Sequence, residues 1–144
     1  MREALALARE AAEDGEVPIG CVIVKDGQIV GRGRNTREKG KNALGHAVIS
    51  AINDACKHLG GWRIPNATLY VTLEPCPMCA GAIINARIDR VCFGAYDPKA
   101  GSCGSLTNLF ELPYNHQPEV TAGVLEDECA QMLKEFFKAL REKA

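Results

Sequence analysis

The spacing of apolar and polar positions divides the chain into alternating helices and strands. Apolar residues recur at helical spacing between residues 5 and 12, and Gly15 is a plausible end for that helix. The β-branched run 19–24 predicts a buried strand, and Asp26-Gly27 predicts a hairpin turn into a second strand over 28–33. The same patterns predict further helices over 46–59, 77–87 and 126–143, and further strands over 67–73, 91–94 and 119–124.

The order of these elements predicts an α/β domain. A hairpin followed by alternating strands and helices favours one mixed sheet with helices on both faces. A length of 144 residues fits a single domain that spans 1–144. The closing helix carries an apolar stripe that we expect to face the core, formed by Cys129, Met132, Leu133, Phe136, Phe137 and Leu140.

Composition and charge exclude some classes of protein, but they do not identify a ligand. The net charge is −1, so the molecule as a whole has no strong attraction for nucleic acid. Residues 32–41 are locally basic, which suits either a phosphate-binding loop or a solvated loop. No apolar run reaches membrane-spanning length and no signal-peptide pattern is present, so we expect no membrane association and a cytoplasmic protein.

Two of the seven cysteines have the spacing of metal ligands. Pro77 predicts a helix start that places Cys76 at the N-cap and Cys79 in the first turn, so both sulfurs can meet one ion. His46 opens the preceding predicted helix, and it must occupy the non-helical cap if it shares a pocket with residue 48. Together these residues fit the zinc deaminase signature H-x-E…P-C-x-x-C. The other interpretation is a buried cysteine pair and a core histidine.

Three protein ligands predict a zinc ion with one position open to water, as in catalytic sites. A structural zinc would need a fourth ligand, and the spacing singles out none of the candidates Cys56, His58 and Cys103.

Several further segments resemble bacterial tRNA adenosine deaminases over nearly the whole chain. They comprise Val17-Pro18-Ile19-Gly20, the run from Leu69 to Cys76, Cys79-Ala80-Gly81-Ala82-Ile83, Gly94-Ala95-Tyr96-Asp97, Asn115-His116 and the closing helix with Phe136-Phe137. The resemblance implies a three-layer α-β-α sandwich with a five-stranded mixed sheet, of the cytidine-deaminase type, and a homodimer. It also implies conversion of the wobble adenosine of a tRNA anticodon loop to inosine, by attack of zinc hydroxide at C6 of the ring.

Residue 48 departs from that family. The family carries a proton-shuttling glutamate two residues after the histidine, and this chain carries Val48. We therefore expect strongly impaired turnover, and we do not expect the nearby Glu74 to replace the lost group.

Two origins of Val48 remain open. One is an engineered or selected change; Asn42-Ala43-Leu44 also replaces the family's Asp-Pro-Thr, which suggests an altered substrate, such as DNA in place of tRNA. The other is a non-catalytic RNA-binding or partner subunit of a deaminase complex. For the function of the chain, a third hypothesis besides a deaminase and a non-catalytic subunit is an interaction domain with a structural zinc.

The resemblance also indicates which residues contact the substrate. Asn35 matches the family's substrate asparagine, and its amide can pair with a purine edge, although Asn is also common in turns. Ala47 would offer a backbone N–H at its helix start. Tyr96, Asp97 and Lys99 match the loop that touches the flanking nucleotides of a single-stranded nucleic acid.

Overall fold

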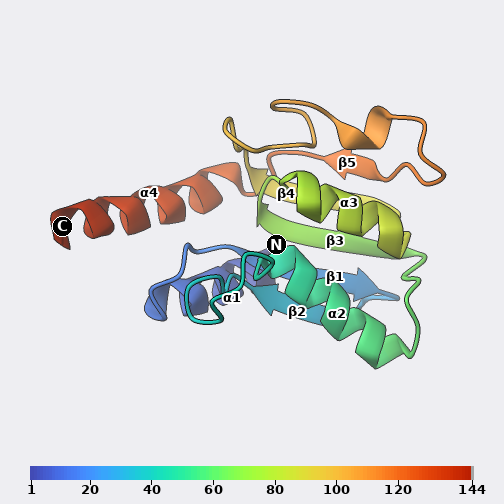
Figure 1. Ribbon diagram of the computed structural model, residues 1–144, viewed down its shortest axis with the longest axis horizontal. Coiled ribbons are helices and arrows are strands. Elements are labelled where there is room, and N and C mark those ends of the chain that lie inside the picture. Colours follow the sequence, from blue (N-terminus) through green and yellow to red (C-terminus); the bar gives the residue numbers. More distant parts are fainter. Residues whose placement is uncertain (144) are drawn as a thin grey trace.

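A five-stranded sheet forms the middle of the molecule, and helices pack on both of its faces (Figure 1). The computed structural model describes residues 1–143. The strands lie in the order β2-β1-β3-β4-β5. Their bounds are Gly20–Lys25 for β1, Gln28–Arg34 for β2, Ala67–Leu73 for β3, Arg90–Ala95 for β4 and Glu119–Thr121 for β5. β1 is antiparallel to β2 and β3, whereas β4 is parallel to β3 and β5, so the predicted mixed sheet is confirmed.

The helices divide into two pairs, which confirms the predicted three layers. Helices α2 and α3 contact each other on one side of the sheet, and α1 contacts α4 on the other. Their bounds are Arg2–Glu13 for α1, Ala47–Leu59 for α2, Pro77–Ala86 for α3 and Glu126–Lys143 for α4. A short 3₁₀ helix, η1 (Leu109–Glu111), was not predicted.

Turn chemistry explains where the first strands and helices end. Asp26 and Gly27 have φ values of 53° and 74°, the left-handed pair that a tight hairpin between twisted strands requires. Gly60 closes α2 with a φ of 74°. Arg87 adopts the same conformation after α3, so this helix ends one residue earlier than predicted.

Small residues let α2 approach the sheet closely. A Cβ atom on Gly31 would lie 2.4 Å from the carbonyl oxygen of Ala51, and one on Gly33 would lie 2.2 Å from that of Ala47. The backbone of α2 therefore lies directly on β2, which places the first turn of the helix against the sheet.

The predicted inward face of α4 is confirmed for the first half of the helix and is wrong for its C-terminal end. Cys129 is buried, but Phe137 is 40% exposed and Leu140 is 54% exposed. Met132, Leu133 and Phe136 are half-buried. The helix contacts the sheet and α1 near its start, and its C-terminal half extends beyond the sheet (Figure 1). An apolar stripe needs a surface to cover, and the sheet ends before this stripe does.

The helices within residues 1–143 do not combine the length and apolar character needed to cross a membrane.

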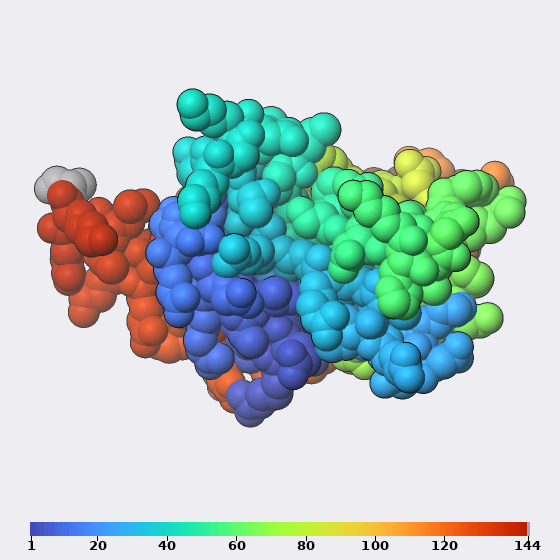
Figure 2. All heavy atoms as spheres, turned by 90° about the horizontal axis from the view of Figure 1, so that it is seen from below, coloured from blue at the N-terminus to red at the C-terminus, as the bar shows by residue number. Residues whose placement is uncertain are grey.

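The view from below in Figure 2 also shows the C-terminal part of α4 projecting from one side of the molecule.

Candidate metal centre and substrate cavity

The first turns of α2 and α3 meet at one end of the sheet. His46 is the N-cap of α2, with extended backbone angles φ −91° and ψ 149°, as its place in the pattern predicted. Cys76 is the extended N-cap of α3, and Pro77 follows at the first helical position. The positive ends of two helix dipoles therefore point at the same region, which favours negative charge there.

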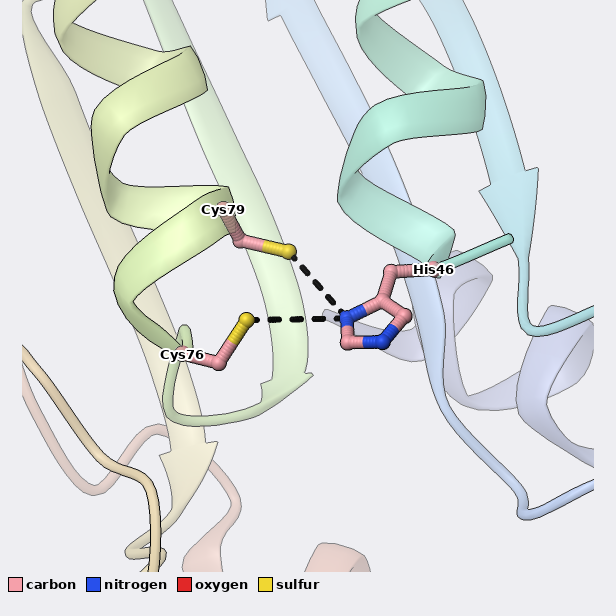
Figure 3. Close-up of side chains that lie close together, drawn as sticks. All are labelled: His46, Cys76 and Cys79. Carbon is pink, nitrogen blue, oxygen red and sulfur yellow. Dashed lines mark hydrogen bonds between the residues drawn. The ribbon is translucent and has the colours of Figure 1, made fainter. Parts of the chain in front are cut away.

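The three predicted ligands converge in this region. The Nδ1 atom of His46 lies 3.6 Å from the Sγ atom of Cys76 and 3.5 Å from that of Cys79. Figure 3 shows the imidazole ring reaching from the start of α2 toward both sulfurs on α3. One donor atom from each residue lies within 4.8 Å of the other two.

These distances fit a zinc ion. Bonds of about 2.3 Å to sulfur and about 2.0 Å to nitrogen at a tetrahedral angle would separate the nitrogen from each sulfur by about 3.5 Å. Within residues 1–143, no other histidine, cysteine or carboxylate lies close enough to join the group as a fourth ligand. Cys56 instead donates its thiol to the carbonyl of Trp62, 3.8 Å away. The donor set thus fits a metal site with three protein ligands.

The two thiols differ strongly in acidity before an ion binds. A hydrogen bond from the Cys79 thiol, helped by the backbone N–H of Cys79 and by His46, lowers the pKa of Cys76 to about 5. The same hydrogen bond, together with burial, raises the pKa of Cys79. A thiol must lose its proton to become a zinc ligand, so metal binding at this pair is coupled to proton release.

A cavity of about 240 Å³ opens over the three ligands. This volume is below the usual range of about 300–1,000 Å³ for small-molecule pockets, so it suits an object as small as one flat base. The cavity also contains Asn35, Ala47, Val48 and Asp97, four residues that the sequence singled out. Most of the remaining wall is apolar and is formed by Val17, Ile19, Val71, Leu73, Pro75 and Ala100.

Asn35 and Ala47 both line this cavity and both carry polar groups. The Asn35 side chain is only 5% exposed, and its amide makes two long contacts of 3.4 Å, to the carbonyl of Val17 and from the N–H of Arg37. Ala47 is the first residue of α2, where a backbone N–H has no acceptor within the helix.

The three residues predicted to touch flanking nucleotides lie in different places. Asp97 lines the cavity, and its carboxylate accepts from the N–H groups of Lys99 and Ala100 at 3.0 and 3.2 Å. Tyr96 is 50% exposed outside the cavity, with its ring edge-on to Phe93. Lys99 lines a separate hollow beside α4.

The basic segment 32–41 is partly neutralised by its own neighbours. Arg34 and Lys39 both form salt bridges with Asp14, at 3.0 and 3.4 Å. Of the basic residues in this segment, Arg37 lines the cavity over the candidate metal centre.

Two buried glutamates near the cavity were not predicted to have a structural role. Glu16 and Glu74 are each 2% exposed. Glu16 accepts from the N–H groups of Glu38 and Lys39, at 3.0 and 2.8 Å. Burial alone would raise the pKa of the Glu74 carboxyl, but hydrogen bonds from Ser105, Asp97 and Cys103 outweigh it and hold this pKa below its usual value. The position of Glu74 directly before Pro75 was the one available signal.

Comparison with known proteins identifies the family of the chain. Residues 1–141 match the MafB19-like deaminases. The chain is 54% identical to a tRNA-specific adenosine deaminase of Bacillus subtilis (strain 168), covering 99% of this chain and 89% of that protein. It is 47% identical to a tRNA-specific adenosine deaminase of Haemophilus influenzae, covering 99% and 84%. The chain therefore belongs to the MafB19-like deaminases, among the bacterial tRNA-specific adenosine deaminases, which are hydrolytic enzymes.

Solved structures confirm the cytidine-deaminase-like fold. A chain from structural studies of A-to-I editing by tRNA:A34 deaminases superposes with a TM-score of 0.89 at 47% identity, covering 92% of this chain and 97% of that one. A guanine deaminase of Bacillus subtilis superposes with a TM-score of 0.65 at 32% identity, covering 99% and 92%.

Proposed function

We propose that this chain is a tRNA adenosine deaminase-type protein that binds zinc and a wobble adenosine, and that Val48 strongly impairs its turnover. The observation that carries the proposal is the convergence of His46, Cys76 and Cys79 beneath a cavity in which residue 48 is a buried valine. The relatives that are named tRNA-specific adenosine deaminases support the choice of substrate.

In this proposal the residues of the cavity fall into groups, and each group has a different task. His46, Cys76 and Cys79 hold the ion. Zinc at this site would act as a Lewis acid and lower the pKa of a bound water toward neutrality. Asn35 and the N–H of Ala47 orient the purine edge, and the apolar wall excludes water from the faces of the ring.

The missing task is proton transfer. A valine side chain neither accepts nor donates a proton, and Val48 is 2% exposed within the apolar core. Deamination needs a group that takes a proton from water and delivers it to the ring and the leaving ammonia. General acid–base assistance of this kind contributes about 10²–10⁴-fold to rate. The proposal therefore predicts binding of the substrate with little turnover.

The size of the cavity and its basic edge support a single-stranded substrate. One base must leave its stack to enter the cavity, which a single-stranded anticodon loop permits at low cost. Arg37, which lines the cavity, would contact a phosphate of that loop. A retargeted single-stranded DNA would use the same contacts.

The partner and compartment follow from the family in the same way. We propose a homodimer, on the resemblance to the tRNA deaminases, in the cytoplasm where tRNA is modified. Ile83, Ile84 and Ile88 are at most 8% exposed in one chain, so they belong to its core. Sedimentation equilibrium measures the mass directly, and a monomer at micromolar concentration would contradict the dimer.

A second function, a non-catalytic RNA-binding or partner subunit, is favoured by one observation. Val48 packs in the same core cluster as Ala47 and Ala51, so the fold does not need a carboxylate at this position. This function predicts affinity for the anticodon loop without turnover at any enzyme concentration.

The test is single-turnover deamination of a tRNA anticodon stem-loop with zinc-loaded protein in excess. We expect Val48→Glu to form inosine at least about 100-fold faster than the unchanged chain. Val48→Gln is the matched control, because it has the size of glutamate without its acid–base chemistry, and it should remain slow. Equal rates for the unchanged chain and Val48→Glu would refute the role given to residue 48. Zinc and RNA binding without turnover in all three proteins would favour the second function.

A further inference from the structure

The carboxylate of Glu74 is surrounded by hydrogen-bond donors from one loop, which we call the rim loop (residues 97–105). One oxygen accepts from the N–H of Asp97 at 3.1 Å and from the hydroxyl of Ser105. The other accepts from the N–H of Cys103 at 3.1 Å and from that of Ser105 at 3.0 Å. Within residues 1–143, no cationic side chain forms a salt bridge with it.

This arrangement leaves Glu74 no capacity for proton transfer. An ionised carboxylate has about four lone-pair positions, and four donors occupy them here. Accepting a proton would break at least one of these bonds in a buried place, where a lost bond is costly. Although Glu74 lines the cavity, its carboxylate is hydrogen-bonded to the rim loop and has no lone pair left for a water molecule.

The backbone of the rim loop lies against the Glu74 carboxylate. A Cβ atom on Gly101 would lie 2.4 Å from a Glu74 oxygen, so the loop backbone passes directly over the carboxylate. The N–H of Ser102 also donates to the carbonyl of Pro75 at 2.9 Å. Asp97 and Ala100 of the same loop form part of the cavity wall. The loop that shapes the cavity is thus tied to the two residues that precede the ligand Cys76.

A second buried carboxylate, Glu16, holds a loop with fewer hydrogen bonds. Glu16 is equally buried, but it accepts only two backbone N–H groups, from Glu38 and Lys39. Neither of those residues lines the cavity, whereas Asp97 does. Glu16 therefore provides a comparison, because it is a buried carboxylate that holds a different loop and makes no hydrogen bond to the rim loop.

We propose that Glu74 is a positioning residue that holds the rim loop in the shape that receives the base, and so sets the affinity for RNA and not the affinity for zinc. The RNA part of this statement rests on the proposed function. The loop part rests on the hydrogen bonds alone.

The experiment measures three quantities on zinc-loaded protein: zinc content, hydrogen exchange of the rim loop, and anisotropy of a labelled anticodon stem-loop. The variants are Glu74→Gln, Ser105→Ala and Glu16→Gln. We expect Glu74→Gln to retain one zinc per chain, to exchange faster in the rim loop, and to bind the stem-loop about tenfold more weakly. Ser105→Ala removes one donor and should show the same changes at smaller size. Glu16→Gln should leave rim-loop exchange unchanged.

A kinetic measurement separates positioning from chemistry. In the Val48→Glu background, Glu74→Gln should raise KM about tenfold with little change in kcat, because the lost contacts shape binding. A loss confined to kcat, or rim-loop exchange that stays unchanged in folded Glu74→Gln, would overturn the proposal. If Glu74→Gln does not fold, the same criteria apply to Ser105→Ala. An unchanged chain that binds no stem-loop would contradict the proposed function, and hydrogen exchange would still decide whether Glu74 holds the loop.

Discussion

Helices α3 and α4 are both rich in apolar side chains, yet they have opposite surroundings. Helix α3 has 10 residues and buries five of them, whereas α4 has 18 residues and buries only Cys129. The shorter helix carries two of the three candidate metal ligands at its start. The longer helix ends with Leu140 more than half exposed.

The difference comes from connectivity. Helix α3 joins the parallel strands β3 and β4, so the chain must lay it back across the sheet. Within residues 1–143, helix α4 does not connect two strands, and it packs on the sheet through Cys129, Met132 and Leu133, which share a cluster with Leu73 and Ala95. Helical periodicity shows that a face is apolar, but the connections decide whether anything covers it.

Removing a ligand from the start of α3 should give the largest effect. Cys79→Ala is expected to lose the bound zinc and with it the stabilisation that ligand binding supplies, about 4 kcal/mol at a thousandfold excess over Kd. Zinc content and thermal unfolding with and without a chelator measure this effect. Cys56→Ala is the control, since this cysteine lies outside the ligand group. Stoichiometric zinc in Cys79→Ala would contradict the site.

Truncating a buried side chain in the middle of α3 should give the second largest effect. Ile83 is fully buried, so Ile83→Ala is expected to lower the free energy of unfolding by about 2–5 kcal/mol. Urea unfolding of the zinc-loaded protein measures the change. A loss below about 1 kcal/mol would mean that α3 is less firmly packed than its burial indicates.

The contact that holds α4 can be tested at Gly94. A Cβ atom there would lie 2.3 Å from the Cys129 sulfur and 2.9 Å from the carbonyl oxygen of Thr72. Gly94→Ala is therefore expected to cost about 1–3 kcal/mol by overpacking. Adding Cys129→Ala removes the nearer clash and should recover part of the loss in a double-mutant cycle. Strict additivity of the two changes would show that α4 is held elsewhere.

Acid should weaken the hold of Glu74 on the rim loop. The pKa of Glu74 is lower in the folded protein than its ordinary value of about 4.3, so its ionised form favours folding. This stability is present above pH of about 4.3 and is lost as the pH falls through the folded pKa. Glu74→Gln should therefore flatten the curve of unfolding free energy against pH below about pH 5. An unchanged curve would show that the hydrogen bonds to Glu74 are not stabilising.

The smallest effect is expected at the exposed end of α4. Leu140→Ala changes a side chain that is 54% exposed, so the free energy of unfolding should change by no more than about 0.5 kcal/mol. The same leucine or isoleucine truncation thus separates α3 from α4. A loss comparable to that of Ile83→Ala would mean that another molecule covers α4 in solution, and sedimentation of both variants would then reveal it.

Local chemistry in the sequence determined the elements and the ligands. The Asp26-Gly27 turn, the cap at Gly60 and the bounds of β3 depend on nearest neighbours, and the structure reproduces them. The extended backbone of His46 and the helix start at Pro77 were also predictable, because helix caps are specified within one turn.

Only the tertiary structure decided what these parts contact. The four donors around Glu74 lie 23 to 31 residues away in the chain, so no local pattern could reveal that its carboxylate is fully used. The same holds for Tyr96 and Lys99, which share a loop with Asp97 but lie outside the cavity. Spacing along the chain determines which way a side chain can point, whereas burial and hydrogen bonding depend on segments that the fold brings together from a distance.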